Sequence, residues 1–255
     1  MTASFNPFTL EGKNIIITGA SSGIGQQCAL DCSKIGAKII LIGRNNERLQ
    51  RSLSNLLGDG HIAISYDLTN FSQLPKLVED IVSSIGKVDG LVNCAGISTT
   101  LPYKLITTEK LEDFFRVNVF SSIELTREVV KNKHMNSEGS VIFLSSVMGC
   151  VGESGKSLYS MTKGALISAC RSLACEFAKR KIRFNCISPG AILTPINEHL
   201  PHMADPEQRS VLERKHLLGL GHTSDISSAC IYLLSNASRW VTGQNLIIDG
   251  GYTVK

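Results

Sequence analysis

Short apolar runs rich in β-branched residues alternate along this chain with longer amphipathic segments. The apolar runs predict strands at 14–18, 38–43, 62–66, 91–96, 140–145, 183–187 and 245–248. The amphipathic segments predict helices at 24–35, 46–57, 71–85, 111–133, 158–180 and 226–234. Strands that alternate with helices of about 12 to 23 residues form right-handed βαβ units, and hence a parallel sheet covered on both faces. We therefore expect an α/β fold, a single doubly wound domain over residues 1–255 with a seven-stranded parallel sheet.

Composition and charge exclude several classes of protein. The chain has 255 residues, of which 43% are hydrophobic, and no linker-like stretch divides it. Its net charge of +4 is small and the basic residues are scattered, so we expect no nucleic-acid partner. The eight cysteines include no C-x-x-C pair, which favours free thiols in a reducing compartment. Because no apolar run reaches the roughly 18 residues of a membrane span and no signal peptide is evident, we expect a cytoplasmic protein without a membrane partner.

A glycine-rich segment, Gly19-Ala-Ser21-Ser22-Gly23-Ile24-Gly25, lies between the first predicted strand and the first predicted helix. Strand, glycine turn and helix together form a phosphate-binding arrangement, because glycines allow close backbone approach and the helix N-terminus attracts an anion. The spacing G-x-x-x-G-x-G differs from the common dinucleotide fingerprint, and an ordinary tight turn is the alternative. The flanking strand and helix favour a pyrophosphate site.

The end of the second predicted strand carries the residue that would contact the adenosine ribose. Gly43 and Arg44 occupy this end, without an Asp or Glu. A carboxylate there would bind the ribose 2′-hydroxyl of NAD, whereas an arginine can form paired hydrogen bonds to the 2′-phosphate of NADP. We therefore predict NADP(H), with NAD(H) possible, and a solvated strand-end residue is the alternative for Arg44. Asp67, after the third strand, is either an adenine contact or a cap of the following helix.

Tyr159 and Lys163 are four residues apart in the predicted helix 158–180, so their side chains share one face. A lysine charge about 4 Å from the phenol would stabilise the phenolate by roughly 4 kcal/mol at an effective dielectric near 20. The tyrosine pKa would then fall from about 10 toward neutrality, as carbonyl reduction requires of a general acid/base. Taken alone, the pair also fits an exposed helix face.

Other polar residues lie where a site could form. Asn118 is an amide among apolar residues of the predicted helix 111–133, where it either belongs to a site or caps or bends that helix. Ser146 ends the fifth strand, where a hydroxyl either donates to a substrate or serves a turn. Asn93-Cys94-Ala95-Gly96 is a small-residue turn that could brace the glycine loop or line the cofactor site.

The segment 191–221 is polar and proline-containing, which is typical of an irregular lid over a site. Three histidines within it could suggest a metal: His199, His202 and His216. Because no cysteines or carboxylates cluster with them, we interpret them as solvated lid residues and expect no metal.

In combination and in this order, the motifs resemble the short-chain dehydrogenase/reductase family over essentially the whole chain. Thr18–Gly25 is similar to the family's cofactor motif, and 93–96 to its N-N-A-G motif with Cys94 in place of the second Asn. Ser188-Pro189-Gly190 is similar to the motif after the sixth strand. The resemblance implies a Rossmann fold and an oxidoreductase acting on a small-molecule carbonyl or alcohol.

The resemblance also implies a catalytic tetrad. In such a site the nicotinamide exchanges a hydride with a carbonyl carbon while Tyr159 gives or takes the proton on oxygen. Ser146 would hydrogen-bond the carbonyl oxygen, Lys163 would hold the nicotinamide ribose and lower the tyrosine pKa, and Asn118 would anchor a water that relays protons to Lys163.

The implied contacts to the cofactor extend over the carboxyl ends of several strands. Asp67 would contact adenine, Asn93 the adenosine ribose, and Ile192 and Thr194 the carboxamide. The full set comprises Gly19, Ser21, Ser22, Gly23, Ile24, Gly25, Arg44, Asp67, Leu68, Asn93, Ala95, Gly96, Tyr159, Lys163, Pro189, Gly190, Ile192 and Thr194.

The motifs leave the substrate open. The nearest similarity is to 3-oxoacyl-[acyl-carrier-protein] reductases, whose carrier docks on basic residues by the active-site mouth. Arg180 fits one such position, whereas Ser137 occupies the other. A sugar, polyol or steroid is an equally admissible substrate. Because cells usually hold NADPH reduced, we expect ketone reduction to be the physiological direction. A non-catalytic NADP-binding relative and an isomerase or dehydratase on the same fold are further alternatives.

The resemblance also implies an oligomer. Pairing through the helices 111–133 and 158–180, as in the family, would give a homotetramer or homodimer.

Overall fold

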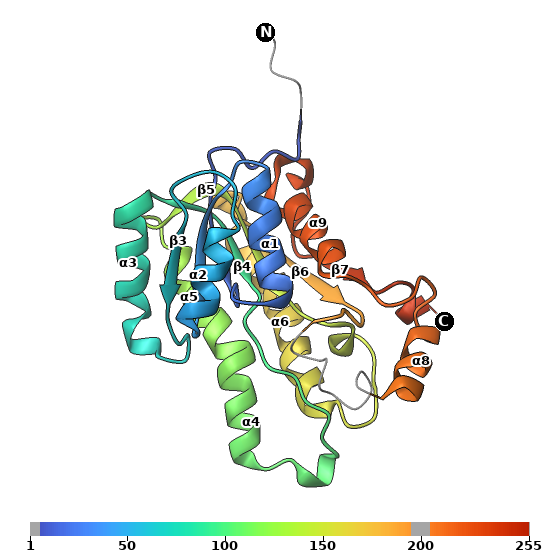
Figure 1. Ribbon diagram of the computed structural model, residues 1–255. Helices are drawn as coiled ribbons and strands as arrows, with labels where there is room; N and C mark the ends of the chain where they lie inside the picture. Colours follow the sequence, from blue (N-terminus) through green and yellow to red (C-terminus); the bar gives the residue numbers. More distant parts are fainter. Residues whose placement is uncertain (1–5, 195–204, 255) are drawn as a thin grey trace.

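The computed structural model describes residues 6–194 and 205–254. Its centre is one seven-stranded parallel sheet, as predicted, and the strand order is β3-β2-β1-β4-β5-β6-β7 (Figure 1). The strands are β1 Asn14–Thr18, β2 Lys38–Gly43, β3 Ile62–Ser65, β4 Val88–Asn93, β5 Met135–Leu144, β6 Arg183–Pro189 and β7 Asn245–Ile248. Strand order reverses between β1 and β4, and ligands of doubly wound sheets bind outside the carboxyl ends of the strands at such a reversal.

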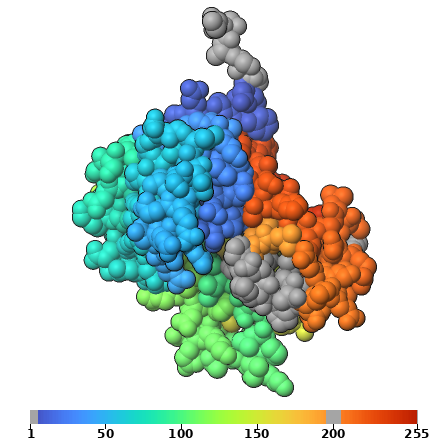
Figure 2. All heavy atoms as spheres, in the orientation of Figure 1, coloured from blue at the N-terminus to red at the C-terminus, as the bar shows by residue number. Residues whose placement is uncertain are grey.

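Helices cover both faces of the sheet because alternate strand residues point to opposite sides. On one face, Ile15, Ile17 and their neighbours pack with α1 Gly23–Lys34, α2 Asn46–Ser54 and α9 Thr223–Leu234. On the other, Ile16 and its neighbours pack with α3 Leu74–Ile85, α5 Ser121–Val129 and α6 Ser157–Glu176. The space-filling view shows α1, in blue, packed directly against α9, in orange-red, although they are far apart in sequence (Figure 2).

Most predicted elements differ from the structure by a few residues at their ends, and β4 begins and ends three residues earlier than predicted. Two of the differences arise where polar residues obscure the pattern. β5 begins at Met135 rather than 140, since the exposed residues 136–138 break the apolar run. The helix predicted over 111–133 consists of α4 Thr108–Phe115, a π-helical stretch Arg116–Phe120 and α5, which ends at Val129. Asn118 lies in the π-helical stretch, so the prediction that it could bend its helix agrees with the local geometry.

The expectation that 191–221 is irregular is wrong in part, because α8 Pro206–Arg214 lies within it. Asp205 starts this helix by accepting hydrogen bonds from the amides of Glu207 and Gln208, both at 2.9 Å, and Pro206 occupies the first turn. His216 is buried rather than solvated, at 5% exposure. His199 and His202 lie outside the described residues. Among the helices of the described ranges, none combines the length and apolar character that crossing a membrane requires.

Candidate active site

A cavity of about 1420 Å³ opens at the carboxyl ends of the strands. It is lined by the loops that follow β1, β2, β3, β4, β5 and β6, and by side chains of α6 and α8. The sheet thus collects predicted site residues that are far apart in sequence. Of these, all line the cavity except Asn93 and Asn118, which are buried beside it at 2% and 0% exposure.

The glycine loop has the geometry that a pyrophosphate site needs. Gly19 and Gly23 have φ of +64° and +57°, which favour glycine. A Cβ on Gly25 would lie 2.5 Å from the carbonyl oxygen of Gly19, so only glycine fits this close approach. Ser22 precedes α1 in an extended conformation without a side-chain cap, and the first turn carries no acidic residue. The amides and positive end of α1 are therefore available to an anion.

The turn after β4 braces the glycine loop, one of its two predicted roles. The hydroxyl of Thr18 accepts hydrogen bonds from the amides of Cys94 at 3.0 Å and Ala95 at 3.1 Å. Asn93 donates to the hydroxyl of Thr126 at 3.2 Å, and its Oδ1 has no hydrogen-bond partner among the described residues. Its side chain is buried and does not line the cavity, whereas Cys94, which was not predicted to contact a ligand, does.

Arg44 is exposed at the end of β2 and lines the cavity, as does Arg48 in the first turn of α2. Neither guanidinium forms an ion pair within the described residues. Asp67 accepts hydrogen bonds from the amide and hydroxyl of Thr69, at 2.9 and 2.8 Å, which together with the charges of Arg44 and Arg116 hold its pKa below the usual value. Asp67 is not a helix cap, because α3 begins only at Leu74 and its N-cap is Gln73. Its ionised side chain lines the cavity beside Arg44 and Arg48.

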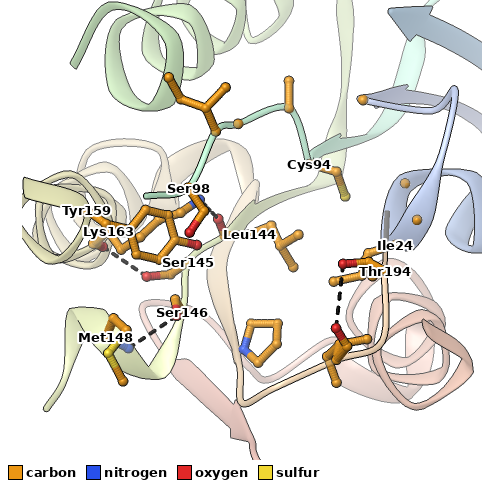
Figure 3. Close-up of a pocket in the computed structure, with 18 of the residues that line it drawn as sticks. Ile24, Cys94, Ser98, Leu144, Ser145, Ser146, Met148, Tyr159, Lys163 and Thr194 are labelled. Carbon is orange, nitrogen blue, oxygen red and sulfur yellow. Dashed lines mark hydrogen bonds between the residues drawn. The ribbon is translucent and has the colours of Figure 1, made fainter. Parts of the chain in front are cut away.

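Tyr159, Lys163, Ser145 and Ser146 lie on one side of the cavity, and Ile24 and Thr194 lie on the other (Figure 3). Lys163 is 5% exposed and donates from Nζ to the carbonyl oxygen of Leu144 at 2.7 Å. Its own carbonyl oxygen accepts from the hydroxyl of Ser145 at 2.9 Å. Ser146 accepts from the amide of Met148 at 3.2 Å, so its hydroxyl can donate to the oxygen of Tyr159 or of a substrate.

Burial has the largest effect on the pKa values of Tyr159 and Lys163. It raises the pKa of Tyr159 to about 12, against an opposing hydrogen bond with Ser146, and lowers the pKa of Lys163 to about 8. The prediction that Lys163 brings the tyrosine pKa toward neutrality is therefore wrong for this structure. The ammonium is held by the Leu144 carbonyl and lies 5.6 Å from the centroid of the Tyr159 ring. Tyr159 is accordingly a protonated phenol at neutral pH, and can donate a proton.

Asn118 joins the loop after β4 to α6 through its side-chain amide. Its Oδ1 accepts from the amide of Ile97 at 2.8 Å, and its Nδ2 donates to the carbonyl oxygen of Ile97 at 3.0 Å and to the hydroxyl of Thr162 at 3.1 Å. A Cβ on Gly96 would lie 3.1 Å from Oδ1 of Asn118 and 3.6 Å from Nζ of Lys163. Gly96 therefore lets this loop pass close to the lysine.

Several residues that line the cavity were not among the individually predicted site residues, although most of them fall in the segment 147–158, expected to form the substrate pocket, or in the predicted lid 191–221. They are Glu153 and Lys156 before α6, Lys215 and His216 after α8, and Tyr252 near the carboxyl terminus. His216 joins two of these segments: its Nε2 accepts from the amide of Ala191 at 3.1 Å, and its Nδ1 bonds to the carbonyl oxygen of Leu212 at 2.8 Å. No group of three or more potential metal ligands occurs within the described ranges.

Arg180 does not lie at the mouth of the cavity, so that prediction is wrong within one chain. Its guanidinium donates to the carbonyl oxygens of Val130 and Met135, at the start of β5. Tyr159 lies near the opposite end of α6, about 25 Å along the helix from its last residue, Glu176, and Arg180 lies beyond that end.

Comparisons with known proteins agree with this geometry. A family model described as enoyl-(acyl carrier protein) reductase matches residues 19–253. Glucose 1-dehydrogenase of Gluconobacter oxydans is 34% identical over 95% of this chain and 92% of its own length. The 3-oxoacyl-[acyl-carrier-protein] reductase of Bos taurus is 33% identical over 94% of this chain and 97% of its own.

Solved structures share the whole fold. A short-chain dehydrogenase/reductase from Serratia marcescens has a TM-score of 0.89 and 27% identity, covering 97% of this chain and 100% of the other. A putative NAD(P) dependent gluconate 5-dehydrogenase from Beutenbergia cavernae, with bound NADP at low occupancy, has a TM-score of 0.88 and 26% identity, covering 98% and 100%.

Proposed function

This chain belongs to the short-chain dehydrogenase/reductase family, and from that premise we propose that it is an NADP(H)-dependent oxidoreductase that interconverts a ketone and a secondary alcohol. The observation that carries the proposal is the convergence of Tyr159, Ser146 and Lys163 on one wall of a cavity that also contains an open glycine loop. When bound, the nicotinamide supplies or accepts the hydride.

The residues of this chain fit such a cofactor. The amides of the glycine loop would bind the pyrophosphate, as the steric demand at Gly25 indicates. Arg44 and Arg48, both on the cavity wall, would bind the 2′-phosphate that distinguishes NADP from NAD. Asp67, Leu68, Ala95, Gly96, Pro189, Gly190, Ile192 and Thr194 would complete the cofactor site from the wall of the cavity. We propose that Asn93 stabilises the end of β4 through its buried hydrogen bond to Thr126, and does not make the predicted contact to the ribose.

The tetrad would act through the proton on the substrate oxygen. Tyr159, protonated at neutral pH because its pKa is about 12, would donate that proton in ketone reduction. Ser146 would donate a hydrogen bond to the same oxygen, where negative charge grows. Lys163 would hold the nicotinamide ribose. Asn118 would hold the loop that carries Gly96 and Ile97 close to Lys163, and would anchor the water that relays protons to this lysine.

The relatives favour no single substrate. Their printed names include a 3-oxoacyl thioester reductase and a sugar dehydrogenase, so reduction of a 3-oxoacyl thioester and oxidation of a sugar, polyol or steroid are both candidate reactions. The position of Arg180 weakens the case for an acyl carrier within one chain. We further propose a cytoplasmic homotetramer or homodimer: the eight cysteines are free, and Phe120 and Met161 leave apolar side chains exposed on the long helices.

Titration of the purified protein with NADPH and NADH by nucleotide fluorescence tests the cofactor, and NADPH oxidation across a panel of ketones, sugars and an acetoacetyl thioester tests the reaction. We expect tighter binding of NADPH and turnover of at least one ketone. Arg44→Glu should weaken NADPH binding about 10- to 100-fold and leave NADH binding within about 3-fold. Preference for NADH in the wild-type protein would refute the 2′-phosphate assignment.

A further inference from the structure

Lys156 places a buried positive charge in the wall of the cavity, one helical turn before Tyr159. It immediately precedes α6, is 7% exposed and lines the cavity. Its ammonium donates to the hydroxyl of Thr100 at 2.7 Å and to the carbonyl oxygen of Thr99 at 3.3 Å, on the loop after β4. Two of its three protons are thus directed to neutral oxygens, which leaves one for a further acceptor.

The charges around this lysine are unbalanced. Of the described residues that line the cavity, Asp67 and Glu153 carry the carboxylates, whereas the basic side chains are Arg44, Arg48, Lys156, Lys163 and Lys215. Glu153 is the carboxylate whose charge acts on Lys156, and it already pairs with Nζ of Lys215 at 3.5 Å. Burial outweighs its effect and lowers the pKa of Lys156. A buried ammonium without its own counter-ion is costly to the fold, and an incoming anion would offset that cost.

Holding two loops together does not require this charge. The amide of Leu101 already donates to the carbonyl oxygen of Gly155 at 2.7 Å and joins the same two segments. A neutral side chain could bond to Thr100 without the desolvation cost of an ammonium. The choice of lysine therefore points to something that enters the cavity.

We infer that the substrate carries an oxyanion group, a carboxylate or a phosphate, which Lys156 binds while the carbonyl lies at Tyr159. This inference rests on the proposed oxidoreductase function and specifies its substrate class. Lys156 and Tyr159 lie three residues apart at the start of α6 and line the same cavity, so one short molecule can reach both groups. A small oxo acid or a phosphorylated ketose has this form.

Matched pairs of substrates test the charge directly. The pairs are 4-oxopentanoate with its methyl ester, and dihydroxyacetone phosphate with dihydroxyacetone; whichever anion is preferred identifies the oxyanion. We expect kcat/KM of the wild-type enzyme to favour the anionic member of at least one pair by about 10-fold or more. Lys156→Met should raise KM for the anionic member enough to remove most of that preference, and leave kcat/KM for the neutral member within about 3-fold of the wild-type value.

Three further variants separate charge from structure. Thr100→Val removes one neutral partner of Lys156 but keeps the ammonium, and should preserve the preference for the anion. Lys156→Arg should also preserve it, and Glu153→Gln should increase it. NADPH titration of each variant shows whether the cofactor site remains folded.

Two results would overturn the inference alone. One is a wild-type enzyme that turns over neutral ketones as well as or better than both anions, which leaves the proposed oxidoreductase function intact. The other is an equal loss of the preference for the anion in Thr100→Val and Lys156→Met, which would show that the lysine only holds the two loops together. If NADPH binds and no carbonyl is reduced, the proposed function fails, and this inference fails with it.

Discussion

Lys163→Met tests whether this lysine is retained for chemistry at the expense of stability. The side chain is 5% exposed, and burial lowers its pKa from 10.5 to about 8. A change of this size corresponds to about 3 kcal/mol of unfavourable free energy for the charged form in the folded state. Between these two pKa values the unfolded chain binds more protons than the folded one. The penalty is therefore fully present below pH 8, and disappears as the pH approaches 10.5.

Methionine removes this penalty but also removes the hydrogen bond from Nζ to the Leu144 carbonyl oxygen, 2.7 Å long. Loss of that bond costs about 1 to 2 kcal/mol. We expect Lys163→Met to be more stable than the wild type by about 1 to 2 kcal/mol at pH 7, and less stable by a similar amount near the ordinary lysine pKa of 10.5. Turnover should be lost at every pH.

Urea unfolding followed by circular dichroism, at several pH values from neutral to alkaline, measures both proteins. Subtracting the wild-type free energy of unfolding cancels the titration of buried thiols such as Cys28 and Cys32, whose pKa values are raised. Lys104→Met, at an exposed lysine, is the matched control and should show a difference near zero that does not change with pH. A difference for Lys163→Met that stays constant with pH, or that grows more favourable as pH rises, would refute the reasoning.

Three further outcomes are expected. A Cβ at Gly25 would lie 2.5 Å from the Gly19 carbonyl oxygen, so Gly25→Ala should abolish NADPH binding in a fluorescence titration, while Gly152→Ala, with nothing within 4 Å, should bind normally. Asn118→Ala removes three hydrogen bonds, two of them to the Ile97 backbone, and should lower the free energy of unfolding by about 2 to 4 kcal/mol in urea; a loss below about 1 would contradict this. The kcat/KM for NADPH, which reports the free enzyme, should fall as pH rises past about 8, where Lys163 loses its proton, and a flat profile would exclude that assignment.

Much of the fold followed from the sequence because hydrophobic periodicity and glycine turns are local signals. β1 and β7 were predicted to the residue, and the order of strands and helices gave the doubly wound sheet. At Asn118 the sequence offered a bend only as one alternative, and it did not show the hydrogen bonds to Ile97, which is distant in sequence. α8 was missed although Asp205 and Pro206 form a recognisable helix start, since the prolines of this segment suggested an irregular lid.

The candidate site was predicted in its residue types but not in its electrostatics. Spacing placed Tyr159 and Lys163 on one face, yet their pKa values depend on burial, which spacing does not reveal. Lys156 carries no motif of its own in the sequence, and its burial depends on tertiary contacts such as the hydrogen bond to Thr100. Arg180 was misplaced for the converse reason: it matched a motif position whose surroundings, the carbonyls of Val130 and Met135, are tertiary.

NADPH oxidation by the wild-type protein and by Tyr159→Phe, followed side by side on one carbonyl panel, tests the proposed chemistry most directly. Phenylalanine keeps the ring and removes the proton donor. We expect turnover by the wild type, a fall in kcat of about 10²- to 10⁴-fold in the variant, and NADPH affinity within about 3-fold. Equal turnover by both proteins would contradict the assignment of Tyr159 as the proton donor, and NADPH binding without turnover of any carbonyl by the wild type would contradict the reaction itself.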